Sequence, residues 1–320
     1  MYRLEITKRI ANGGVVTIAV TTLLSAVFWF LPLVSEPAAN EASELVFMGN
    51  GLFAVPTVIS KVLAFVFWAV VWYSARSVLT FVIGMAVVTA VCQLQFFDSG
   101  MVAFGFFYPA WLTVFDFYSV SNQVNESFRA VLLILISSLF VPEYIWMLSL
   151  FFLGLVVFKV GSARIFISFA VALLVFVWLV WGVCFSIGEV SLFYDYVAQF
   201  ANFDFFSFQG NVVHIVGLTT LFVAVTVVMI ALIGISHKYD ARMRMNGTFI
   251  NIAFILTFAM TVVCKEFNPG LLATVVLMAA LVFARYFSTE RSNFANIAFL
   301  VFLVLLFAYR VTDGLIKLEI

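Results

Sequence analysis

The sequence predicts an all-α protein, a polytopic transmembrane helical bundle with about eleven spans (roughly 10 to 12). Apolar residues make up 65% of the 320 residues, charged residues make up 10%, and the mean hydropathy is +1.18. Such a composition leaves too little polar surface to coat a soluble domain. Apolar runs close to the length of a membrane span recur along the chain, and the few basic residues fall in alternate gaps between them. A helix of about 20 residues crosses a hydrocarbon core of about 30 Å.

Polar breaks divide the chain into its predicted spans. We take residues 1–320 as a single integral membrane domain with short loops and no soluble domain. The spans are residues 14–34, 57–75, 78–96, 101–118, 128–140, 144–158, 165–187, 212–235, 248–264, 271–287 and 294–309.

The charges in the gaps predict an orientation, because basic residues in short loops are retained in the cytoplasm and acidic residues contribute little. Twelve of the 16 basic residues lie at the N-terminus or in even-numbered gaps: Arg3, Lys8, Arg9, Arg76, Arg129, Lys159, Arg164, Lys238, Arg242, Arg244, Arg285 and Arg291. Acidic residues gather in the odd-numbered gaps: Glu36, Glu41, Glu44, Asp98, Glu143, Glu189, Asp195 and Asp204. We therefore expect a cytoplasmic N-terminus and a C-terminus on the opposite side of the membrane.

The segment 128–158 has two interpretations. Val141, Pro142 and Glu143 divide two runs that are each shorter than an ordinary span. A single helix would be about 46 Å long and would reverse the side of every later loop, whereas a hairpin keeps the charge pattern. Interrupted helices at membrane depth often line a binding site, and two short tilted helices packed by their neighbours are the plainer alternative.

Several function classes lose support. No Asp or Glu lies near the middle of a predicted span, which disfavours an ion-coupled transporter. Lys61 lies inside an apolar run, but Pro56 is expected to begin that helix, so we expect Lys61 to snorkel to the outer surface rather than to be a buried functional lysine. His214 and His237 are predicted to lie on opposite sides of the membrane and cannot share a metal ion, so no metal site is expected. No other cofactor is expected. The net charge is zero, and nothing indicates a nucleic-acid partner.

The first outer segment, residues 35–50, contains three candidate catalytic residues, Glu36, Glu41 and Glu44. By analogy at the level of the fold, membrane glycosyltransferases that use lipid-linked sugars place carboxylates in such a loop to bind a metal or to activate an acceptor. A solvated acidic loop is the alternative.

The second outer segment, residues 189–211, carries Asp195 and Asp204 among many aromatic residues. Aromatic faces beside carboxylates suit a sugar, and they equally suit a helix that lies flat at the membrane interface. His214 lies one turn into the following helix, where it could act on this segment as an acid or a base. We count all three as candidate catalytic residues.

The inner loop at residues 236–246 contains Lys238, Arg242 and Arg244, which are close enough in sequence to meet one lipid phosphate. Anionic headgroups attract such clusters by about 1 kcal/mol per charge. Anchoring of the inner face, as the positive-inside rule requires, is the alternative role.

Three segments carry a resemblance: 237–246, the Phe-Val-Pro-Glu-Tyr sequence at 140–144, and Ala-Arg-Tyr-Phe-Ser-Thr-Glu-Arg at 284–291. Together they resemble an uncharacterised multi-pass inner-membrane protein family of bacteria, over roughly the half of the chain that follows Arg129. The resemblance implies a bacterial inner-membrane location, and in that membrane the orientation expected from the charges places the C-terminus in the periplasm. It implies no activity and no catalytic residues.

Three hypotheses about the function of the protein are left open. The first is an envelope-assembly protein that handles a lipid-linked glycan or a lipid, as an enzyme or a flippase. The second is a non-catalytic membrane scaffold or partner subunit, and the third is a uniporter-like carrier of a small solute. The partners expected are the lipid bilayer and, under the first hypothesis, the lipid or lipid-linked glycan itself.

Overall fold

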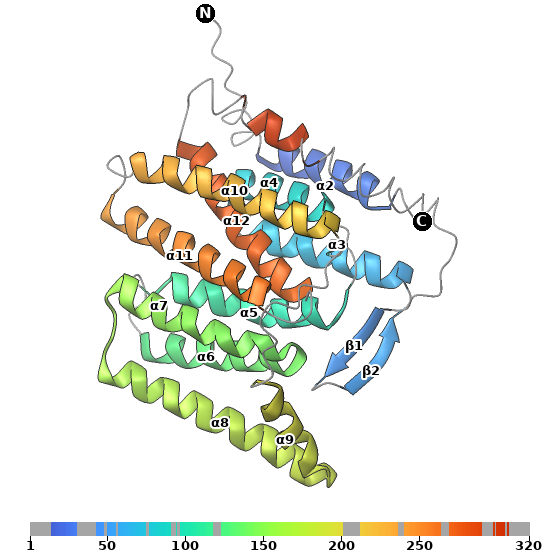
Figure 1. Ribbon diagram of the computed structural model, residues 1–320, viewed down its shortest axis with the longest axis vertical. Helices are drawn as coiled ribbons and strands as arrows, with labels where there is room; N and C mark the ends of the chain where they lie inside the picture. Colours follow the sequence, from blue (N-terminus) through green and yellow to red (C-terminus); the bar gives the residue numbers. More distant parts are fainter. Residues whose placement is uncertain are drawn as a thin grey trace, which may run out of the picture.

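The computed structural model describes residues 14–30, 43–47, 50–55, 57–74, 77–90, 94, 97–117, 123–200, 212–235, 240–263, 269–289, 297, 299–304 and 306. Most of these residues belong to apolar helices that lie side by side in a bundle (Figure 1). The longer helices are α2 (Gly14–Phe30), α3 (Thr57–Ser74), α4 (Val78–Ala90), α5 (Ser99–Phe115), α6 (Gln123–Phe140), α7 (Leu148–Phe158), α8 (Ala163–Ile187), α10 (Val212–Gly234), α11 (Ala241–Val263) and α12 (Pro269–Thr289). The predicted helical bundle is confirmed.

The helices overlap the first ten predicted spans, and in the eleventh the described residues 297, 299–304 and 306 are helical. Within the described part of the chain, five segments are long and apolar enough to cross a membrane by length and composition. They are Gln123–Phe140, Ala163–Ile187, Val216–Gly234, Ala241–Val263 and Pro269–Thr289. The other helices are apolar but shorter, so the number of eleven crossings stays a prediction.

Not every described element is a helix. Strands β1 (Ser43–Phe47) and β2 (Asn50–Val55) form an antiparallel hairpin with an irregular register between Leu45 and Val46. β1 packs near α5 and α6 at one end of the bundle (Figure 1). The all-α prediction is therefore correct for the bundle and incomplete for the loop that joins α2 to α3.

Most of the described basic residues gather at one end of the bundle. This end, which we call the basic end, carries Arg129, Lys159, Arg164, Arg242, Arg244 and Arg285, together with the acidic Asp116, Glu126 and Asp240. The opposite end, which we call the acidic end, carries Asp98, Glu143, Glu189 and Asp195 together with Lys61. The alternation of basic residues along the chain thus becomes a separation of basic residues in space.

The segment 128–158 forms a hairpin of two helices. Near the start of α8, Ser168 donates a hydrogen bond to the carbonyl of Val124 at the start of α6 (2.8 Å), so both helices begin at the basic end. Because α6 and α8 begin at the same end, the chain must return across the bundle between them, and α7 makes this return. The chain turns back at Val141 and a 3-10 turn, η3 (Pro142–Met147), because proline cannot continue the hydrogen-bonding of α6 and is well tolerated as the first residue of a new helical turn.

Helix α12 lies at the centre of the bundle and is buried along nearly its whole length. It contacts α4, α5, α10 and α11. Helix α8 lies at the edge, against α6 and the short helix α9 (Val190–Gln199), and most of its apolar surface is exposed. The start of α12 therefore lies among the polar groups of the acidic end, and its last turns lie among those of the basic end.

Candidate functional site

A cavity of about 430 Å³ opens at the basic end between α4, α5, α11 and α12. This volume falls in the range of small-molecule sites, about 300–1,000 Å³. Its wall combines apolar side chains with hydroxyl, amide and guanidinium groups. The described lining residues are Ser77, Thr80, Phe115, Met243, Asn246, Gly247, Ile250, Leu281, Ala284, Arg285, Ser288 and Thr289.

Arg285 supplies the positive charge in this wall. Its Nη2 donates a hydrogen bond to the carbonyl oxygen of Met243 (2.9 Å), which fixes α12 against the first turns of α11. The guanidinium lies directly over Gly247, where a Cβ atom would occupy the same space. Glycine at position 247 therefore lets the arginine pack flat against the backbone of α11.

The neutral polar groups of the cavity come from three helices. On α12, the hydroxyl groups of Ser288 and Thr289 each donate to the carbonyl of Arg285 (2.9 Å each). Just before α4, the Ser77 hydroxyl accepts a hydrogen bond from the backbone N–H of Thr80 (3.5 Å). On α11, the Oδ1 atom of Asn246 is buried in the wall without a hydrogen-bond partner. These groups, with one arginine and no carboxylate, His, Cys or Lys among the described lining residues, suit recognition of a polar or anionic group.

Arg242 and Arg244, two of the predicted lipid-phosphate residues, are exposed in the first turn of α11 on either side of Met243. They flank the cavity without lining it. The third, Lys238, lies outside the described residues. The sequence therefore identified the correct end of the molecule, and the arginine that enters the cavity wall is Arg285.

At the acidic end, Tyr144 joins the broken segment to the start of α12. The side chain is fully buried, and its hydroxyl donates to the carbonyl of Gly270 (2.6 Å) and lies 2.9 Å from the hydroxyl oxygen of Thr274. Asp98 and Glu143 both lie near enough to interact electrostatically with Tyr144. The Pro-Glu-Tyr break thus places polar groups against the start of α12.

Lys61 belongs to the same end, and the prediction that it snorkels is wrong. Only 2% of its surface is exposed, because neighbouring helices cover this face of α3. The adjacent Ser60 hydroxyl accepts a hydrogen bond from the N–H of Phe97 (2.7 Å) and donates to its carbonyl (3.2 Å). These two bonds hold the start of α3 against the residue that precedes Asp98.

Asp98 caps α5 with a partly buried carboxylate. Its Oδ1 accepts a hydrogen bond from the N–H of Met101 (2.9 Å). Burial raises the pKa of Asp98 from 3.8 to about 6, and the hydrogen bonds from backbone N–H groups, Met101 first, act in the opposite direction. Burial is the larger effect, so the native state favours the protonated form more than the unfolded chain does.

We expect a pH-dependent stability from this group. Because the native pKa of Asp98 is the higher one, its contribution to stability is fully present below about pH 4 and is lost as the pH rises through about 6. The Tm of the detergent-solubilised protein, measured across that window, should fall more steeply in the wild type than in the Asp98→Asn variant. Parallel curves for the two proteins would show that Asp98 has no raised pKa.

The predicted catalytic residues of the outer segments do not come together in the described part of the structure. Asp195 is exposed on α9, whereas the next residue, Tyr196, is buried and its hydroxyl lies 2.6 Å from that of Ser138 on α6. α9 therefore docks through its tyrosine and turns Asp195 away from the bundle. Glu36, Glu41 and Asp204 lie outside the described residues, as do the side chains of Glu44 on β1 and His214 on α10.

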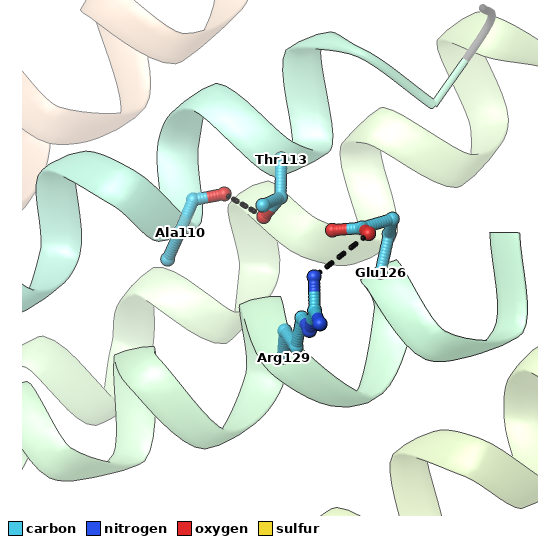
Figure 2. A network of polar contacts seen from close by, with 4 residues as sticks. All are labelled: Ala110, Thr113, Glu126 and Arg129. Atoms are coloured by element: carbon cyan, nitrogen blue, oxygen red, sulfur yellow. Dashed lines mark hydrogen bonds and ion pairs between the residues drawn. The ribbon is translucent and has the colours of Figure 1, made fainter. Parts of the chain in front are cut away.

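A further polar contact at the basic end concerns Arg129. Its Nη1 lies 3.2 Å from Oε1 of Glu126, one turn earlier on α6. Figure 2 shows this pair beside the last turns of α5, where the Thr113 hydroxyl donates to the carbonyl of Ala110 (2.7 Å). The arginine is largely exposed, and an exposed pair of this kind contributes about 0–1 kcal/mol, so it is not part of a site.

Sequence reasoning missed Arg285 and Tyr144 as site residues. Both lie in segments that carried the family resemblance, but neither stands in a polar run that would single it out. The glycines were the available signal: Gly247 and Gly270 stand immediately before predicted spans, and small residues in membrane helices mark close approach of another element.

The fold and the two polar regions define a class, a helical protein whose apolar helices are compatible with a membrane. Comparison with protein-family models, with curated proteins and with solved structures finds no match.

Proposed function

We propose that this chain is a multi-pass protein of the bacterial inner membrane that binds a lipid or a lipid-linked glycan in the cavity at its basic end, as a step of envelope assembly. The cavity carries this proposal. Its described lining combines apolar side chains with hydroxyl, amide and guanidinium groups, and this combination suits an amphiphile that has one polar and one apolar part.

The charge separation supports the orientation that we propose. With the basic end in the cytoplasm, as the positive-inside rule favours, the cavity opens at the depth of the inner-leaflet headgroups. The N-terminus is then cytoplasmic and the C-terminus periplasmic. An amphiphile could enter from the leaflet with its polar part among the hydroxyl groups and its chain along Phe115, Ile250 and Leu281.

Blocking the cavity should abolish function. Ser288 is exposed in the last turn of α12 at the cavity, so Ser288→Trp would fill the entrance without disturbing a buried contact. In cells depleted of the protein, we expect a lipid or lipid-linked intermediate to accumulate. The wild type should reverse this accumulation and Ser288→Trp should not.

Ser149→Trp is the matched control. Ser149 is also exposed, and its hydroxyl donates to a carbonyl three residues earlier, as that of Ser288 does, but it lies on α7 away from the cavity. The control should reverse the accumulation. Depletion without accumulation of any such intermediate would contradict the proposal and favour the scaffold. Solute flux into proteoliposomes that Ser288→Trp blocks, without lipid binding, would favour the carrier.

A further inference from the structure

We infer that the polar part of the amphiphile is a neutral group rich in hydroxyls, such as a sugar, and that the side-chain amide of Asn246 recognises it. This inference rests on the proposed function and specifies its substrate class. Asn246 lies on α11 immediately before Gly247, in the wall of the cavity. Its amide pairs with hydroxyl groups of the ligand, while the apolar part of the ligand lies along the apolar lining residues.

The first step of the argument is that the arginine of the wall is already engaged with the protein. The Nη2 atom of Arg285 donates to the Met243 carbonyl (2.9 Å), and Arg285 has a further interaction within the chain. Asp116 and Asp240 lie at the same end of the bundle, so this end carries both signs of charge. Recognition of the head group therefore depends on the neutral polar groups of the cavity.

The second step is the state of Asn246. Its Oδ1 atom is buried without a hydrogen-bond partner, and a buried acceptor in this state destabilises the native structure. A ligand that donates a hydrogen bond to this atom removes that cost, and the free energy recovered adds to binding. The amide also has two N–H donors, and its oxygen and nitrogen exchange places when the group turns about its last bond. A hydroxyl group pairs with either side of the amide, because it both donates and accepts.

The third step is the direction of the hydrogen bonds that the hydroxyl groups of α12 make. Ser288 and Thr289 donate their hydrogens to the carbonyl of Arg285 (2.9 Å each). Their oxygens keep lone pairs that can accept, so this part of the lining favours a ligand that brings donors. Sugar hydroxyls bring several donors, whereas a deprotonated phosphate brings only acceptors. An ammonium group also brings donors, but it has the same sign of charge as Arg285 in the wall.

The test is equilibrium binding to the purified full-length protein in a detergent without a sugar head group, read by the ligand-induced rise in Tm and by native mass spectrometry. The probes are a monoglucosyl diacylglycerol, diacylglycerol, phosphatidic acid and free glucose. The three lipids share the same apolar part and differ in the polar part. We expect the glucosyl lipid to bind roughly tenfold more tightly than the other two lipids, which corresponds to about 1.4 kcal/mol. Free glucose, which lacks the apolar part, should bind more weakly than the glucosyl lipid.

Asn246→Leu is the decisive variant, because leucine has a similar size and no hydrogen-bonding group. It should lower the affinity for the glucosyl lipid roughly tenfold and change that for diacylglycerol much less. Asn251→Leu is the matched control and should change neither affinity. Asn251 lies on the same helix and its Oδ1 is also buried without a partner, but it is not among the described residues that line the cavity. Ser288→Ala, at an exposed position, should weaken binding of the glucosyl lipid without lowering the Tm of the unliganded protein.

The outcomes separate the inference from the proposed function. If Asn246→Leu binds the glucosyl lipid as the wild type does, or if Asn251→Leu weakens it equally, Asn246 is not the recognition group and the inference fails. Binding of phosphatidic acid or diacylglycerol as tight as that of the glucosyl lipid overturns the sugar class but leaves an amphiphile site. Free glucose that binds as tightly as the glucosyl lipid, and more weakly in Asn246→Leu, supports recognition of a sugar and contradicts the amphiphile of the proposed function. Binding of none of the four probes contradicts both.

Discussion

Replacement of Gly270 by leucine is expected to destabilise the bundle strongly at its acidic end. A Cβ atom at position 270 would lie 2.7 Å from the carbonyl oxygen of Gly100 and 2.9 Å from its Cα. Both are backbone atoms, so no side chain can rotate away, and α12 and α5 must separate. Overpacking costs about 1–3 kcal/mol where side chains can adjust, and we expect at least the upper value here.

The substitution also affects the bond that joins the broken segment to α12. The carbonyl of Gly270 accepts hydrogen bonds from Tyr144 (2.6 Å) and from Thr274 (3.1 Å), so a shift of this helix start disturbs both. The measurement is the Tm of the purified protein in detergent, and a drop of several degrees is the expected result.

Gly182 provides the control for this prediction. It lies inside α8, and a Cβ atom there would have no neighbour within 4 Å. Gly182→Leu should therefore leave the Tm unchanged or raise it slightly, because glycine inside a helix costs about 0.5–1 kcal/mol relative to alanine. If the two leucine variants lost equal stability, the close contact between α5 and α12 would be excluded.

The sequence predicted well where the helices begin and end. It predicted poorly which face of each helix packs against the other helices. Each of the first ten spans could be placed because a polar break, often with Gly, Pro or a charge, ends an apolar run of helical length. The reversal at Pro142 was one of two interpretations, and the charge pattern favoured the correct one. The hairpin of β1 and β2 was not predicted, because the three glutamates of residues 35–50 are typical of a solvated acidic loop.

Lys61 shows why the neighbours are hard to predict. Its depth in the bundle was predicted from Pro56, but whether its side chain faces lipid or protein depends on the face of α3 that packs inward. In a soluble helix a polar face would settle this question, whereas α3 is apolar almost all round because lipid and protein core both accept apolar groups. The same lack of an amphipathic signal hid the cavity, because its wall combines two pairs of helices, α4 with α5 and α11 with α12, that are far apart in the sequence.

The second large effect is expected from Phe249→Ala, which tests the packing behind the cavity. Phe249 is fully buried on α11, its ring stacks on Trp111 of α5 at 4.7 Å between centroids, and it meets Phe158 of α7 at 5.1 Å. Three helices therefore converge on one side chain. Truncation of a buried phenylalanine typically costs about 3–5 kcal/mol, from lost contacts and from the cavity left behind.

Phe185→Ala is the matched comparison, because Phe185 also stacks on a tryptophan, Trp181, at 5.3 Å, but it lies on the outer face of α8 with 62% of its surface exposed. There detergent or lipid can replace the lost ring, so the Tm should change little. Phe249→Ala should lower the Tm by several times as much and should also weaken lipid binding, because Phe115, which lines the cavity, packs against Phe249. Equal losses of stability in the two variants would mean that Phe249 faces lipid rather than the core, and the wall of the cavity would then have to be assigned to other residues.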